Sequence, residues 1–224
     1  MGIDYINNSP KLLREWINRE KSDAEIYFRI NKDSLIPNFE KELRAKGFVF
    51  EISNQTYDLV PKHKDVVLPI AIKYYHLARE LKKENEQIHF MRFLSFKGDD
   101  EVVPFLLEDF YSSETSDHAR WFISSCIYTI RSKKYINDYL QIVSNSSYGK
   151  NRQMFILLLG KFKVEDAIPM LIELLEDEDV RLQAINALAS FKRKEFRCHF
   201  ERFQNSLHSG WRKYSRAALN KLDK

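Results

Sequence analysis

The sequence predicts an all-α protein built as a solenoid of helical hairpins, and three observations support this prediction. Gly and Pro are scarce, at six each among 224 residues, while 44% of the chain is hydrophobic. This composition is typical of helices joined by short turns. Arg152 is followed by apolar residues three, six, seven and ten positions later, and the same pattern begins again at Arg181. A helical pattern that recurs at about this period is the signature of a repeat array.

The same pattern marks the first helix of five successive repeats. Its leading position is filled, at spacings of 34, 32, 29 and 31 residues, by Glu86, Arg120, Arg152, Arg181 and Arg212. Ten residues after each of these comes an apolar residue, namely Phe96, Ile130, Phe162, Phe191 and Leu222. We therefore expect about five helical-hairpin repeats, with Trp211 to Leu222 as a lone first helix that caps the stack.

Three second helices share a start signal in which an acid precedes a proline. The segments 65–72, 101–107 and 166–172 carry this signal. We expect the acid to cap each helix and the proline to lie in its first turn, where a missing N–H is tolerated. The expected second helix at 194–208 departs from the pattern because it has no proline and carries extra charge.

The region before the array has its own helix signals. Ser9 and Pro10 predict the start of one helix. A second helix is expected from residue 33 or 34, with Gly47 as its C-terminal cap. We interpret residues 1–33 as an N-terminal helical cap and residues 34–224 as a single continuous repeat domain.

Several classes of protein are disfavoured by what the sequence lacks. The N-terminus has no basic start followed by an apolar run, and no apolar segment approaches the roughly 20 residues that a membrane span needs. Cys126 and Cys198 fall on apolar helical patterns, so we expect two buried thiols in a reducing compartment. The six histidines have no metal-ligand spacing, and neither a phosphate-binding glycine loop nor a nucleophile turn occurs. We expect a cytoplasmic monomer without metal or cofactor, and the sequence favours a non-catalytic protein.

Two segments resemble HEAT repeats. Residues 176–188 carry the pattern D-x-x-V-R-x-x-A-x-x-A-L, and residues 167–175 carry a matching Ala-Ile-Pro start. Residues 43–76 are similar to the opening of small bacterial HEAT-repeat proteins through Leu43, the Gly47-Phe48 pair, the Tyr57 to Val60 segment and Pro69. The likeness covers residues 34 to 222. It implies a right-handed α-α superhelix that acts as a protein-interaction scaffold or adaptor.

The resemblance also implies roles for particular residues. In HEAT repeats the repeat arginine usually bonds to acids and carbonyls in a neighbouring turn, which favours a structural role for Arg120, Arg152, Arg181 and Arg212; a ladder for binding is the alternative. The second helices of the family line a concave groove. Aligned on the prolines, the solvent-facing residues of this ridge are Lys73, Glu108, Gln141, Glu173 and Arg202, with His76 and Tyr111 in the next row.

The alternating signs along this ridge favour a protein-binding groove. A groove for nucleic acid would instead present a run of Lys and Arg. Tyr75, Tyr111 and Tyr139 would serve as aromatic anchors if they are not buried. We therefore expect this ridge to bind another protein. The alternative is that it is simply a solvent-exposed face without a partner.

The C-terminal part of the chain is basic. Residues 181–224 contain 11 Lys and Arg against three acids, a net charge of +8, whereas the whole chain carries +4 and residues 1–180 therefore −4. This end would meet phosphate or an acidic partner, or form a solvated cap. The residues of the predicted basic patch are Lys192, Arg193, Lys194, Arg197, Arg212, Lys213 and Arg216.

The alternative function is nucleic-acid binding through this basic end. Trp121 and Trp211 adjoin repeat arginines and could stack on bases, although packing between first helices also accounts for them. The combination is similar to helical-repeat DNA glycosylases for alkylated purines, and that resemblance implies an enzymatic site at Asp117, Trp121 and Arg212. No longer glycosylase motif matches.

Overall fold

The computed structural model describes residues 33–48 and 62–223, in which the secondary structure is helical and no strand occurs. The chain divides into two compact units, Met1–Phe90 and Met91–Lys224. The helix expected at Ser9 and almost all of the expected cap at 1–33 lie outside the described residues. The single continuous domain over 34–224 remains a prediction.

Unit 1 contains α3 (Ile36–Ala45) and α5 (Lys64–Glu80), and it includes most of α6 (Glu84–Met91). Helices α3 and α5 pack together around an aromatic cluster of Phe39, Tyr74 and Phe90, whose ring centroids lie 5.1 to 5.7 Å apart. At the leading repeat position, Glu86 accepts a hydrogen bond of 2.8 Å from the backbone N–H of Leu35. A carboxylate here stabilises the N-terminal end of α3, whose first amides have no partner within the helix.

Gly47 ends α3 as the sequence predicts. Its φ of +88° is favourable only for glycine, and its N–H bonds to the carbonyl of Arg44 while the N–H of Phe48 bonds to that of Leu43. These two bonds form a Schellman motif, the standard way in which a left-handed residue closes a helix. The sequence was sufficient to predict the end of this helix, because the motif involves only residues 43–48.

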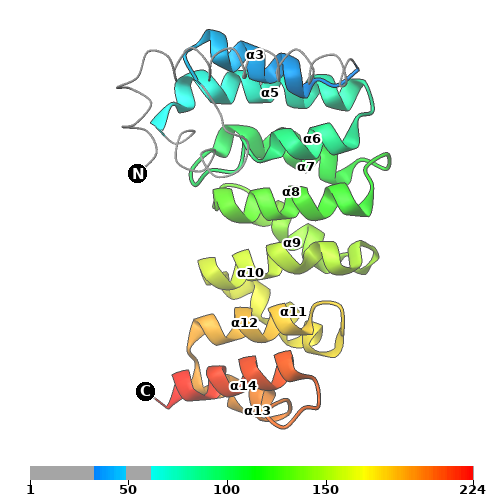
Figure 1. The fold of residues 1–224 in the computed structure, drawn as a ribbon. Helices are drawn as coiled ribbons and strands as arrows, with labels where there is room; N and C mark the ends of the chain where they lie inside the picture. The colour runs from blue at the N-terminus through cyan, green and yellow to red at the C-terminus, as the bar shows by residue number, and fades with distance from the viewer. Residues whose placement is uncertain (1–32, 49–61, 224) are drawn as a thin grey trace. The chain divides into compact units, whose positions relative to one another are not determined.

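Unit 2 is a helical solenoid whose helices stack in chain order (Figure 1). The first helices pack one on the next; they are α8 (Asp117–Ile130), α10 (Gln153–Phe162), α12 (Arg181–Phe191) and α14 (Ser209–Leu222). Each second helix packs against the first helix that follows it, and these are α7 (Val103–Tyr111), α9 (Ile136–Ser144), α11 (Ile168–Glu173) and α13 (Arg197–Glu201). The core lies between the two rows and includes Leu106, Ile127, Phe155, Leu171 and Leu188, all fully buried.

The tightest helix contact in unit 2 joins α10 to α12. A Cβ built on Gly160 would lie 2.4 Å from Cα of Ala187, closer than two such atoms can approach. Ser190 adds a polar contact, since its hydroxyl donates to the carbonyls of Gly160 and Ala187. The small residues Gly160 and Ala187 therefore set how closely neighbouring repeats approach.

Some expected details of the second helices are wrong. No side-chain cap occurs at α7 or α11, because a short 3-10 turn precedes each helix and contains the acid: η2 (Asp100–Val102) and η4 (Glu165–Ala167). Pro104 and Pro169 do lie in the first turn, as expected. Pro69 does not, because α5 already begins at Lys64 and Pro69 falls in its interior.

The last hairpin also differs from its prediction. The helix expected over 194–208 is only η6 (Lys194–Phe196) followed by the five-residue α13. Phe196 and Phe200 occupy its buried face. Cys198 lies midway between these two on the opposite face and is exposed, whereas Cys126 is buried as predicted, and both thiols are free. At the start of the array, α6 ends at Met91 and does not reach Phe96.

Candidate functional site

The repeat arginines of unit 2 bind backbone carbonyls at the end of the preceding second helix. Arg120 donates to Phe110 O at 3.0 Å and Ser112 O at 2.8 Å, and Arg212 donates to Ser206 O at 2.6 Å. Arg152 and Arg181 make equivalent bonds, described below. A helix leaves its last carbonyls without partners, and a guanidinium with five N–H donors satisfies several at once. This confirms the structural role favoured for these arginines.

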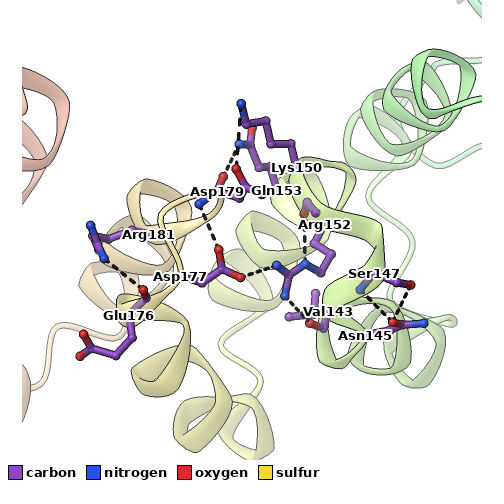
Figure 2. A network of polar contacts seen from close by, with 11 residues as sticks. Val143, Asn145, Ser147, Lys150, Arg152, Gln153, Glu176, Asp177, Asp179 and Arg181 are labelled. Carbon is purple, nitrogen blue, oxygen red and sulfur yellow. Dashed lines mark hydrogen bonds and ion pairs between the residues drawn. The ribbon is translucent and has the colours of Figure 1, made fainter.

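Arg152 is the centre of the polar network between two repeats (Figure 2). Its side chain is only 3% exposed, and it donates to Gly149 O at 3.0 Å, to Val143 O at 3.4 Å and to the carboxylate of Asp177. Asp177 accepts a second bond, of 3.0 Å, from the N–H of Asp179. The network joins the turn before α10 to the turn before α12, so it fixes the spacing of successive second helices.

Arg181 extends this pattern to an aromatic stack. It donates to Leu175 O at 2.6 Å and Glu176 O at 3.1 Å, and its guanidinium lies 4.1 Å from the ring centroid of Trp211. His208 stacks on the same tryptophan at 4.3 Å, with 24° between the rings. Trp211 thus has neighbours on its faces, and cation–π attraction to the buried Arg181 stabilises that position. The sequence could not predict this stack, because it depends on how residues 203–208 fold to bring Trp211 onto Arg181.

The expected ridge residues of unit 2 are exposed on successive second helices. Glu108 lies on α7, Gln141 on α9 and Glu173 on α11, with Arg202 directly after α13. Arg202 forms an ion pair of 2.5 Å with Glu176, which links the last two hairpins. One exposed polar residue per repeat on the same helix row is an arrangement that a partner could contact at several points.

Of the three tyrosines considered as anchors, only one is accessible. Tyr75 and Tyr139 are fully buried and belong to the cores of their units, so they are excluded as anchors. Tyr111 is 40% exposed and contacts the carbonyl of Asp138 at 3.4 Å through its hydroxyl. Partial burial raises the pKa of Tyr111 to about 12.

The remaining two ridge residues belong to unit 1. Lys73 is exposed on α5 and pairs with Glu42 of α3 at 2.7 Å. This hydrogen bond holds the pKa of the Glu42 carboxyl below its ordinary value. His76 is half-buried and its ring meets that of Tyr75 edge to face at 5.6 Å. Both residues therefore already have contacts within their own unit.

The residues of the predicted basic patch fall into two groups at opposite ends of their helices. Lys192, Arg193, Lys194 and Arg197 follow the C-terminal end of α12, where Arg193 pairs with Glu165 and Arg197 with Asp223. Arg212, Lys213 and Arg216 lie in the first eight residues of α14, roughly 9–15 Å from its C-terminal end. Arg216 donates to Gln204 O at 2.8 Å. Whether either group binds a partner remains a prediction.

The residues of the alternative glycosylase site do not converge. Asp117 and Trp121 share α8, and Trp121 is 42% exposed, but Arg212 lies on α14, three first helices further along. At roughly 8–10 Å per packed helix, these groups are about 25–30 Å apart. Asp117 is also engaged, since its carboxylate accepts from Asn151 at 3.0 Å and Arg120 at 3.3 Å.

Neither a metal centre nor a membrane span was found in the part of the chain that the structure describes. No group of three or more His, Cys, Asp or Glu side chains within residues 33–48 and 62–223 is arranged to hold a metal ion. None of the described helices is both long enough and apolar enough to cross a bilayer. Burial raises the pKa of the Cys126 thiol to about 11, which keeps it neutral and unreactive.

A protein-family model for HEAT repeats matches residues 136–206, from α9 to the turn after α13. Residues 136–206 are therefore similar to HEAT repeats. The matched segment contains Arg152, Arg181 and the network of Figure 2, so the family match and the repeat contacts coincide. Comparison with curated proteins finds no match, and comparison with solved structures finds none either. HEAT repeats in general mediate protein–protein interaction.

Proposed function

We propose that the protein is a non-catalytic scaffold that binds another protein along the exposed side of its second helices. The observation that carries this proposal is the row of exposed side chains Glu108, Gln141 and Glu173 on consecutive second helices, one from each. A solenoid repeats its surface once per hairpin, so a partner that lies along the row can contact several repeats.

The chemistry of the row supports a protein partner. Glu108, Gln141, Glu173 and Arg202 offer hydrogen bonds and charges of both signs, and Tyr111 beside them offers a partly exposed ring. Aromatic anchors surrounded by polar residues are typical of protein interfaces. A phosphate backbone would be repelled by Glu108 and Glu173, because it needs an excess of cations.

The inter-repeat network supports a rigid scaffold. Arg152 and Arg181 bind the carbonyls at the ends of α9 and of the turn η5 (Leu174–Glu176), and Arg152 also bonds across to Asp177. These buried bonds hold neighbouring second helices at a fixed spacing before a partner arrives. A pre-organised surface loses little conformational entropy on binding.

The proposal is tested by comparing variants in capture from an extract of the native organism. The ridge variant carries Glu108→Ala, Tyr111→Ala and Glu173→Ala, and the control carries Thr129→Ala, Asn186→Ala and Ala217→Ser on the first helices. We expect one or more proteins to be retained by the wild type and the control and lost from the ridge variant. Equal retention by all three forms, with unchanged circular dichroism, would contradict the proposal.

A further inference from the structure

One edge of unit 2 carries a row of cations that recurs with the repeat. The turns that follow successive first helices place a basic residue eleven positions after the leading repeat residue, and these are Lys97, Arg131, Lys163 and Lys192. All four are exposed, and none takes part in the ion pairs recorded within residues 62–223. We call these four residues the basic row.

Contacts between the turns show that consecutive turns on this edge are neighbours. The N–H of Gly98, next to Lys97, bonds to the carbonyl of Ile130, next to Arg131, at 2.9 Å. Further along, Lys133 lies over the ring of Phe162 at 5.6 Å, and Arg193 pairs with Glu165. The basic row therefore follows the stacking direction of the first helices, with a spacing of about 8–10 Å per repeat.

The backbone at three of these positions is unfavourable for a long side chain. Arg131, Lys163 and Lys192 have φ of 62°, 54° and 57°, in the left-handed region that glycine prefers. This conformation costs a non-glycine residue about 1–2 kcal/mol, whereas a cation at an exposed helix C-terminus contributes only about 0.3–1 kcal/mol. Folding stability alone therefore favours glycine here, and the recurrence of cations points to a role in binding.

Several acids at the opposite edge of unit 2 are paired internally. Asp117 binds Arg120, Asp177 binds Arg152 and Glu176 binds Arg202. At the basic row's own edge, Asp100 pairs with Lys134 at 2.9 Å and Glu165 with Arg193. These two acids are therefore paired with cations outside the basic row, while the exposed Asp166 lies three residues after Lys163.

We propose that the basic row binds an acidic, extended segment of another protein, in which an acid recurs at every third residue. A polyproline II segment has three residues per turn and rises about 3.1 Å per residue, so every third side chain points the same way at intervals of about 9.3 Å. This interval matches the repeat spacing. Acidic, disordered segments sample this conformation before binding, so they can present such a row of carboxylates.

One observation favours a protein segment over a single-stranded nucleic acid. Tyr128 and Phe162, the aromatic residues at this edge, are half-buried, and each has a lysine over its ring: Lys161 over Tyr128 at 5.8 Å and Lys133 over Phe162. Base stacking, the sequence-tolerant part of single-strand binding, therefore has no open platform among these residues.

The test uses the full-length protein and fluorescein-labelled peptides in an anisotropy titration at low ionic strength. The spaced peptide repeats Glu-Pro-Ser four times, and a second peptide of the same composition has its four glutamates together. A single-stranded oligonucleotide of equal charge is the third probe. We expect the spaced peptide to bind most tightly, with an affinity that falls as salt is added.

The first basic-row variant carries Arg131→Gly, Lys163→Gly and Lys192→Gly, and the second carries Arg131→Asn, Lys163→Asn and Lys192→Asn. Both residues tolerate the left-handed backbone, so these variants should fold with equal or higher thermal midpoints. We expect spaced-peptide affinity to fall about tenfold or more in both, because three ion pairs are lost. A control with Lys41→Ala, Lys62→Ala and Lys150→Ala removes the same charge elsewhere and should stay within about twofold of the wild type.

Three results would overturn the proposal. The first is absence of peptide binding at low salt. The second is an equal loss of spaced-peptide affinity in the basic-row variants and in the control. The third is tighter binding of the oligonucleotide or of the clustered peptide, which would indicate a phosphate site or a non-specific positive edge.

Discussion

Arg152 shows how one buried side chain determines the contact between two repeats. Its guanidinium satisfies the carbonyls of Val143 and Gly149 and the carboxylate of Asp177 in a site where its own side chain is 3% exposed. The sequence could predict this role from the repeat position alone. It could not predict which acid is the partner, because that depends on how the turn before α12 folds.

Arg152→Ala should lower the free energy of unfolding by about 3 kcal/mol, because it leaves a carboxylate and two carbonyls without their donor. Arg212→Ala is the matched control, since this half-buried residue binds carbonyls but no acid, and it should cost about 1 kcal/mol. Urea unfolding measures both. Equal losses for the two variants would show that the Asp177 contact contributes little.

Tyr139 gives unit 2 a sensitivity to alkaline pH. Its hydroxyl donates to Ser132 O at 3.1 Å in the core, and burial raises its pKa above the ordinary value of a tyrosine. In the unfolded chain Tyr139 ionises near pH 10, whereas in the folded chain it is still protonated at that pH. The contribution of its hydroxyl to the free energy of unfolding is therefore fully present below pH 10. It is lost as the pH rises from there toward the folded-state pKa.

Tyr139→Phe should lose about 1 kcal/mol at pH 7 with its hydrogen bond, and its stability should then decline less between pH 9 and pH 11 than that of the wild type. The measurement is the urea midpoint as a function of pH. Tyr214→Phe, at a half-buried tyrosine of α14, serves as the control. Parallel pH profiles for wild type and Tyr139→Phe would contradict this account.

At the scale of elements, the predictable features were those set by local chemistry. Gly47 closes α3 with bonds to Leu43 and Arg44, and the residue pattern around Arg181 produced the expected first helix. The errors arose where a neighbouring segment decided the outcome. The acids before α7 and α11 entered 3-10 turns, and Cys198 became exposed because Phe196 and Phe200 take the buried face of a short helix.

The contact of α10 with α12 was not predictable from hydrophobic periodicity, because it depends on the absence of a side chain at Gly160. Gly160→Ala places a methyl group 2.4 Å from Cα of Ala187 and must push the two helices apart. We expect a loss of about 1–3 kcal/mol in spite of the better helix propensity of alanine. Thermal and urea unfolding would measure it.

Gly210→Ala is the control for this substitution, since its Cβ would meet only side-chain atoms, the ring of His208 at 3.1 Å and Cδ1 of Leu182 at 3.5 Å, and no backbone atom. It should change stability by no more than about 1 kcal/mol. Ala187→Gly added to Gly160→Ala should recover little of the loss, because the Cα of residue 187 remains in place. A neutral Gly160→Ala variant would mean that the repeats are not held at this distance.

At the scale of the whole molecule, the candidate binding surfaces follow from stacking rather than from any single residue. In unit 2 each hairpin adds one exposed position to the ridge and one cation to the basic row. The sequence alignment on the prolines found the ridge, because exposure on a second helix follows from helical period. It missed the basic row, because Arg131 and Lys163 lie in turns, and only the structure shows that these turns are neighbours in space.

Position-specific photo-crosslinking would test the scaffold account most directly. A benzoylphenylalanine replaces Gln141, an exposed ridge residue of α9, or Ala217, an exposed residue of the first helix α14, and the protein is irradiated in native extract. We expect a discrete crosslinked protein from position 141, reduced by Glu108→Ala and Glu173→Ala, and none from position 217. Crosslinks from position 217 with none from position 141 would contradict binding along the second helices.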